Sequence, residues 1–286
     1  YRLNFTDDLR WELNWQFRRN QTFSHEARYR LDELTDEWNA DRALTWLPSN
    51  RILLQQALDR DNARYTDHSL HEHNVGTKLT IAKLHIDLNY QYLLRNERLH
   101  ADYPHLDTVM LRHHGTHQAS AHYGLFKKFR TDWSEWYDVR YRYTQTAPDM
   151  DRLVPVSDTY NPLAVITGNP HLKDAQEHQL NFNSNITRYR PHFTFISFAA
   201  GATLYRNRIG MATLYDRATG AYTYRPANLN GNWSAFVSQS FERRMLPDNP
   251  LRYYHFFRYV YDNNVDFVQA DRPDQLMRQP RQQPEP

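Results

Sequence analysis

The sequence contains no cysteine, only 8 glycines, and no apolar run long enough to cross a membrane as a helix. The missing thiols exclude a disulfide framework, a zinc site with thiolate ligands and a cysteine nucleophile. A membrane helix needs about 20 consecutive apolar residues, so a helical membrane protein is not predicted. Lys and Arg number 35 against 33 Asp and Glu, without a basic block, so the charge pattern predicts no nucleic-acid partner.

The sequence signatures of common catalytic sites are also missing, so the chain is not predicted to be an enzyme. There is no nucleophile elbow of the GxSxG type, no phosphate-binding P-loop and no HExxH zinc motif. Two adjacent acidic pairs, Asp7-Asp8 and Asp36-Glu37, fall in predicted turns and are interpreted as solvated.

Fifteen histidines raise the question of a metal site. The closest groupings are His68, His71 and His73, and His113, His114 and His117. A strand places His71 and His73 on one face, but the spacing fixes no third ligand in either group. The histidines are interpreted as solvated side chains, and neither a metal nor another cofactor is predicted.

Aromatic residues are abundant in a chain that is otherwise very polar. The sequence has 20 Tyr, 14 Phe and 7 Trp, yet its mean hydropathy is −0.88. A disordered chain of this polarity would contain fewer aromatic residues. A transmembrane β-barrel reconciles the two properties, because outward apolar residues alternate with polar lumen residues along every strand.

The clearest alternation lies near the N-terminus. Every even position from 10 to 18 is polar, and the odd positions carry Leu9, Trp11, Leu13, Trp15 and Phe17. This period of two predicts a strand whose apolar face contacts lipid. Nine residues tilted by about 45° cover on the order of 20 Å, which is close to the height of the apolar band of a barrel.

Alternation of this kind predicts about ten antiparallel strands. They cover residues 9–17, 23–31, 70–81, 84–94, 117–126, 133–144, 179–187, 192–209, 231–241 and 251–261. A short helix is expected around residues 52–60, and a β-bulge between Phe195 and Ile196. The short connections at 19–21, 82–83, 127–132, 188–191 and 242–250 alternate with long ones. This asymmetry is typical of up-and-down membrane barrels rather than of Greek-key sandwiches.

A proline-rich stretch, residues 146–177, forms the central long connection. Its prolines lack a backbone N–H and fix φ, so none can lie in a central strand. Within it, Gly168-Asn169-Pro170 predicts a turn, with glycine supplying a positive φ.

The residues of this stretch resemble a motif of a known family. Asn161-Pro162-Leu163, Gly168-Asn169-Pro170 and Leu172-Lys173, followed by an asparagine-rich strand, are similar to the loop-and-strand motif of outer-membrane β-barrels of the TonB-dependent receptor type. The family usually continues with Pro-Glu, where this chain has Asp174-Ala175. The resemblance implies that the loop is extracellular and contributes to substrate recognition.

The resemblance also implies a function and partners. Receptors of this type have about twenty-two strands in one chain, so about ten strands correspond to roughly half a barrel. In such receptors a plug domain closes the barrel, and contact with a TonB-type energy complex in the inner membrane drives import. The implied partners are therefore outer-membrane lipid, a plug, that complex and an imported substrate, which the sequence leaves open among iron chelates, cobalamin and glycans.

We therefore predict an all-β, antiparallel, up-and-down transmembrane β-barrel, present in part, in the outer membrane of a Gram-negative bacterium. Residues 1–271 form the barrel segment, and the Pro- and Gln-rich residues 272–286 form a disordered tail. Because the chain begins with Tyr1, we expect it to be part of a longer precursor. Two alternatives stay open: a smaller barrel without energy coupling, and a secreted carbohydrate-binding β-sandwich whose aromatic residues stack on sugars.

Overall fold

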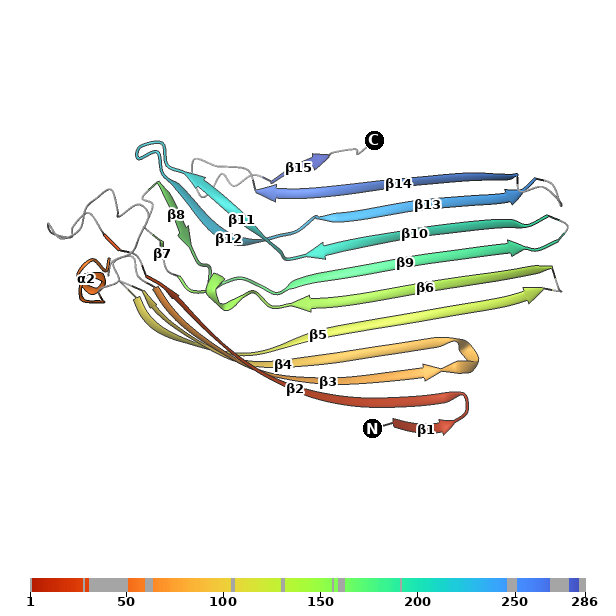
Figure 1. Ribbon diagram of the computed structural model, residues 1–286, viewed down its shortest axis with the longest axis horizontal. Helices are drawn as coiled ribbons and strands as arrows, with labels where there is room; N and C mark the ends of the chain where they lie inside the picture. Colours follow the sequence, from red (N-terminus) through yellow and green to blue (C-terminus); the bar gives the residue numbers. More distant parts are fainter. Residues whose placement is uncertain are drawn as a thin grey trace.

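The computed structural model describes residues 2–27, 29–30, 51–59, 64–103, 106–129, 132–155, 157–158, 163–190, 192–245, 251–267 and 278–282. These residues form mainly β-structure, in one large sheet and one small sheet (Figure 1). No helix in these ranges is long and apolar enough to cross a membrane.

The large sheet is an antiparallel meander of eleven described strands. Its strands, in the order in which they pair, are β1 (Arg2–Thr6), β2 (Leu9–Glu26), β3 (Arg64–Ile81), β4 (Ile86–Tyr103), β5 (Leu106–Phe129), β6 (Trp133–Thr146), β9 (Ala175–Arg188), β10 (Thr194–Arg206), β13 (Trp233–Arg244), β14 (Arg252–Phe267) and β15 (Arg278–Gln282). The prediction of an all-β antiparallel fold is confirmed. Within the described ranges the sheet is open, with β1 and β15 at its edges.

The two ends of the sheet differ, as the sequence predicts, although the connection between β4 and β5, predicted to be long, is short. Short turns join β3 to β4 and β9 to β10 at one end, on the right of Figure 1. The other end, called the long-connection end here, carries the helix α2 (Arg51–Gln56) and the small sheet. The small sheet contains β11 (Arg208–Tyr215), β12 (Tyr222–Leu229), β8 (Ala164–Thr167) and β7 (Ser157–Asp158), paired in that order.

Several strands are longer than predicted. The turn expected at residues 19–21 is wrong, because β2 continues to Glu26 and pairs with β3 throughout. The loop expected at residues 95–116 is wrong as well, since β4 and β5 pair from Ile86 to Tyr103. The apolar alternation stops near Phe17 and Leu94, whereas the backbone ladder continues through residues without a regular apolar period. The alternation therefore predicted only the part of these strands that carries the apolar face.

Two further details differ from the predictions. The β-bulge expected between Phe195 and Ile196 is wrong, because β10 pairs with β9 and β13 in an unbroken register. The long connection expected between the predicted strands 192–209 and 231–241 contains the β11–β12 hairpin. In the turn, the N–H of Ala218 and the hydroxyl of Thr219 donate to the Asp216 carboxylate, and these bonds hold the pKa of Asp216 below its usual value.

The C-terminal tail is described in part. Residues 278–282 form β15, which pairs with the end of β14. The other tail residues predicted to be disordered lie outside the described residues.

Candidate functional site

One face of the large sheet is apolar over most of its width. Because cross-strand partners share a face, the register places the alternating apolar residues of neighbouring strands side by side. This apolar face includes Leu9, Trp11, Leu13, Trp15 and Phe17 of β2, Ile86, Leu88, Tyr90, Tyr92 and Leu94 of β4, Tyr137, Val139, Tyr141 and Tyr143 of β6, and Ile196, Phe198, Ala200, Ala202 and Leu204 of β10. The five residues predicted to face lipid thus lie together on this face.

The apolar face is exposed in the described structure. Trp15 is 66% exposed, Leu180 of β9 is 50% exposed and Tyr259 of β14 is 55% exposed. A monomeric soluble protein rarely leaves a contiguous apolar surface of more than a few hundred Å² in water. One polar group on the face is paired, since the indole N–H of Trp11 donates to Thr77 Oγ1 at 2.6 Å.

Aromatic and histidine rings mark the margin of the apolar face toward the long-connection end. His73 contacts Trp15 and Phe17, with ring centroids 6.1 and 5.0 Å apart. The Tyr90 hydroxyl lies 2.6 Å from His117 Nδ1. The Tyr141 hydroxyl lies 2.9 Å from His178 Nδ1 in the same arrangement two strands further along. Three strand pairs therefore repeat one marginal motif.

The opposite face is mainly polar from β2 to β9 and carries a charged network near the short turns, whereas on β13 and β14 it also carries Phe236, Phe256 and Val260. Asp138 of β6 is fully buried, with 0% exposure. Its carboxylate lies 2.5 Å from His122 Nε2 and accepts hydrogen bonds from Arg140 Nε and Asn183 Nδ2. His122 Nδ1 in turn lies 3.6 Å from Asp87. The network joins β4, β5, β6 and β9, and it balances a buried carboxylate with donors from three residues.

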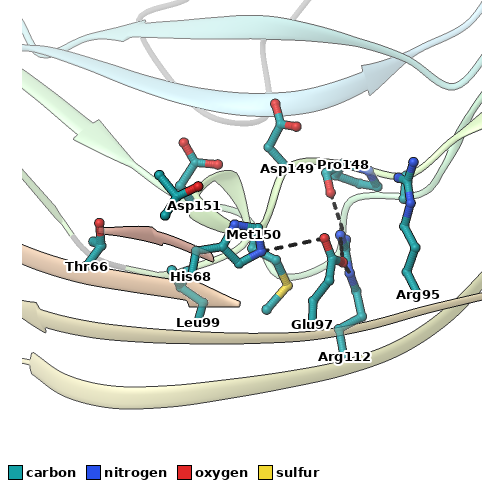
Figure 2. Close-up of a pocket in the computed structure, with 12 residues that line it drawn as sticks. Thr66, His68, Arg95, Glu97, Leu99, Arg112, Pro148, Asp149, Met150 and Asp151 are labelled. Atoms are coloured by element: carbon teal, nitrogen blue, oxygen red, sulfur yellow. Dashed lines mark hydrogen bonds and ion pairs between the residues drawn. The ribbon is translucent and has the colours of Figure 1, made fainter. Parts of the chain in front are cut away.

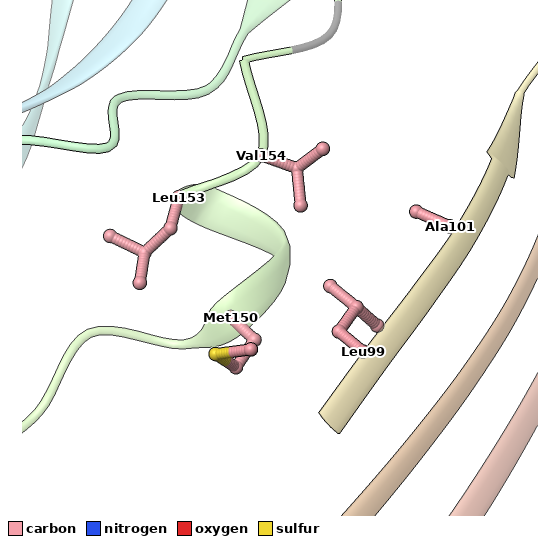
Figure 3. Close-up of a cluster of buried hydrophobic side chains, with 5 residues drawn as sticks. All are labelled: Leu99, Ala101, Met150, Leu153 and Val154. Carbon is pink, nitrogen blue, oxygen red and sulfur yellow. The ribbon is translucent and has the colours of Figure 1, made fainter. Parts of the chain in front are cut away.

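The proline-rich connection folds back onto the polar face at the long-connection end. The short helix η3 (Met150–Arg152) and the residues after it pack against β4. Figure 3 shows this buried cluster, which consists of Leu99, Ala101, Met150, Leu153 and Val154. The connection is therefore anchored by packing and narrows the space over the polar face.

A cavity of about 320 Å³ lies beside this anchor (Figure 2). Arg112 Nε donates to Glu97 at 2.6 Å, and its Nη1 donates to the carbonyl oxygen of Pro148 at 2.7 Å. Arg95 pairs with Glu72 at 2.7 Å, and His68 Nε2 lies 3.6 Å from Glu97. The cavity wall is thus charged, with Arg95 and Arg112 paired to glutamates, and Arg112 ties the connection to β5.

The motif residues of the connection have mainly structural contacts. Asn169 Nδ2 donates to the carbonyl oxygen of Pro226, and the N–H of Lys173 donates to Asn228 Oδ1. Leu172 packs against the buried cluster. The turn lies at Asn169–Leu172 and includes Pro170, because the N–H of Leu172 donates to the Asn169 carbonyl. Asn161 and Pro162 lie outside the described residues.

Gly168 is needed for a different reason than the one predicted. Positive φ values among the described glycines occur at Gly220 and Gly231, so a left-handed conformation of Gly168 is wrong. A Cβ atom at Gly168 would lie 1.8 Å from the carbonyl oxygen of Val154. Glycine is required here because two backbone segments of the connection meet.

Gly168→Ala should therefore release the connection from the sheet. The added methyl group cannot fit without moving backbone, and we expect a loss of about 1–3 kcal/mol in the stability of the folded connection. The measurement is the rate of limited proteolysis within residues 150–170 of the folded protein. Gly124→Ala is the control, because its Cβ would meet only His122 ring atoms at 3.5 Å. Equal cleavage rates for the two variants would show that the close approach is not needed.

Comparisons with known proteins give no relative for this chain. No family model, no curated protein sequence and no solved structure matches it.

Proposed function

We propose that these strands form part of the wall of a transmembrane β-barrel in the outer membrane of a Gram-negative bacterium, as the barrel segment of a TonB-dependent receptor that imports a substrate. The observation that supports the membrane location best is the apolar face, which is exposed and lies opposite a polar face. Lipid would cover the first, and a water-filled or plugged lumen would contact the second.

The aromatic-histidine motif at the margin of the apolar face also supports a barrel, because its position shifts along the strands from one strand pair to the next. Phe17 of β2 and His73 of β3 lie in one cross-strand row. Counted along the strands, the pair Tyr92–His117 of β4 and β5 lies two residues away from this row. The pair Tyr143–His178 of β6 and β9 lies two residues further in the same direction. The motif thus shifts by one residue per strand. At about 3.3 Å per residue and about 4.8 Å between strands, this shift corresponds to a tilt of about 35° between strands and membrane normal. Barrel strands tilt by about 35–45°.

The two alternatives predict different surroundings for the apolar face. A β-sandwich requires a second sheet packed against it. The small sheet instead lies at the long-connection end, and the side chains of the apolar face remain exposed in the described ranges. A smaller barrel without energy coupling has the same kind of wall, so the receptor assignment rests on the motif of residues 161–173. Cross-linking to TonB during import separates the receptor from the smaller barrel.

The experiment that tests the membrane proposal is fractionation of cells that make the native protein. We expect it in the outer-membrane fraction, resistant to carbonate extraction, and with heat-modifiable migration in gels, because a barrel stays folded in detergent until it is heated. Outer-membrane marker enzymes and a periplasmic protein serve as controls. Recovery of a soluble monomer without detergent would end the barrel proposal and the receptor function with it.

A further inference from the structure

The face that carries the apolar residues changes character immediately beyond its margin. Next to the row of Phe17, His73, Leu94 and Gly115, two cross-strand rows of β2–β5 are rich in nitrogen donors. The first row is Arg19, His71, Asn96 and His113, and the second is Gln21, Ser69, Arg98 and Leu111. These two rows are called the donor strip here. Neither row contains a carboxylate.

The charged and histidine side chains of the donor strip are accessible. Arg19, His71, Arg98 and His113 are all exposed. Within the described ranges, neither arginine forms a salt bridge. On β2–β5, the carboxylates of this face lie only farther out, and Asp67 and Asp107 there already accept hydrogen bonds from Gln21 and His100.

Arginines on the polar face behave differently. Arg95, Arg112 and Arg140 each pair with a carboxylate, from Glu72, Glu97 and Asp138 respectively. These three arginines of the polar face are thus paired with carboxylates, whereas Arg19 and Arg98 of the donor strip have no such partner within the described ranges. An arrangement of this kind is complementary to an anion that approaches from outside the sheet.

We propose that the donor strip binds the phosphorylated head group of a lipid in the leaflet on the long-connection side. This inference rests on the proposed membrane location. With the apolar face in hydrocarbon, the donor strip lies on the head-group side of the ring pairs of the margin. The planar guanidinium group of arginine matches phosphate oxygens in a bidentate manner, and histidine adds further nitrogen donors when it is protonated.

The test uses the native protein, purified and folded in a non-ionic detergent. The probe is fully phosphorylated lipid A, and the lipid that stays bound is counted by native mass spectrometry. Arg19→Gln and Arg98→Gln should each weaken binding about fivefold, and the double variant about thirtyfold. Arg18→Gln with Lys128→Gln is the matched control, because it removes the same charge from the polar face. We expect this control to bind like the wild type.

Two further arms identify the ligand. Enzymatically dephosphorylated lipid A should bind at the level of the double variant, and excess inorganic phosphate should not displace the intact lipid. Equal binding of both lipids, or wild-type binding by the folded double variant, would overturn the proposal. Displacement by inorganic phosphate would show a simple anion site and overturn it as well. Each variant is first checked for heat-modifiable migration, so that a loss of lipid binding by the donor strip is distinguished from a failure of the protein to fold as a barrel.

Discussion

Leu88→Arg should leave much of the protein outside the membrane, whereas Asn89→Arg should insert like the native chain. Both residues lie in β4, on opposite faces. Leu88 is 41% exposed on the apolar face between Leu79 and Ala121, while Asn89 lines a polar cavity of about 360 Å³. An arginine that faces lipid near the bilayer midplane costs about 2–4 kcal/mol, which is about 30-fold or more in the ratio of inserted to uninserted protein.

The measurement is the fraction of each variant that reaches the outer membrane with heat-modifiable migration, normalised to total synthesis. The adjacent Asn89→Arg variant controls for the added charge and size. Comparable insertion of both variants would mean that the apolar face does not contact lipid. Leu13→Arg and Asn14→Arg repeat the comparison on β2, where Leu13 is also exposed on the apolar face.

Asp138→Ala should lower the free energy of unfolding by about 1–3 kcal/mol, because Asp138 is fully buried while its partners Arg140 and His122 are partly exposed. The substitution leaves Arg140 and His122 without the carboxylate that balances them, and it removes the acceptor of Asn183. Asp138→Asn keeps the shape but loses the charge, so we expect an intermediate loss. The measurement is urea unfolding of the protein folded in lipid vesicles.

Asp102→Ala is the matched control for this prediction. Asp102 is exposed at the far end of β4, so its loss should change stability by no more than about 0.5 kcal/mol. If Asp138→Ala and Asp102→Ala unfold at the same urea concentration, the buried network does not hold the four strands together.

The alternation in the sequence was sufficient to predict the all-β antiparallel sheet and the side chains that share the apolar face. Along Leu9 to Phe17, for example, the period of two is compatible with only one arrangement, a strand with its apolar side chains on one face. It could not predict where strands end, because beyond the apolar face the lipid-facing alternation stops, and Leu99 and Ala101 are buried instead by the proline-rich connection. Arg19 and Arg98 therefore fell in predicted connections, although both lie in strands.

The polar networks were missed for a different reason. Asp87, His122 and Asp138 come from three strands and meet only when the register is known. One signal was present in the sequence, since each residue occupies the polar parity of its strand. The role of Gly168 was likewise hidden, because its contact with Val154 depends on how the connection folds back.

The extension of β2–β5 beyond the apolar face also determines what other organisms would meet at the cell surface. In the proposed orientation, a hydrogen-bonded rim stands above the membrane. His25, Tyr65, Asp102 and Asp107 lie there in one cross-strand row, each from a different strand, and the rings of His25 and Tyr65 stack at 4.2 Å. An antibody or a phage that contacts this row recognises a conformational epitope. Linear peptides copied from any single strand would not reproduce it, so immunisation against the rim requires the folded sheet.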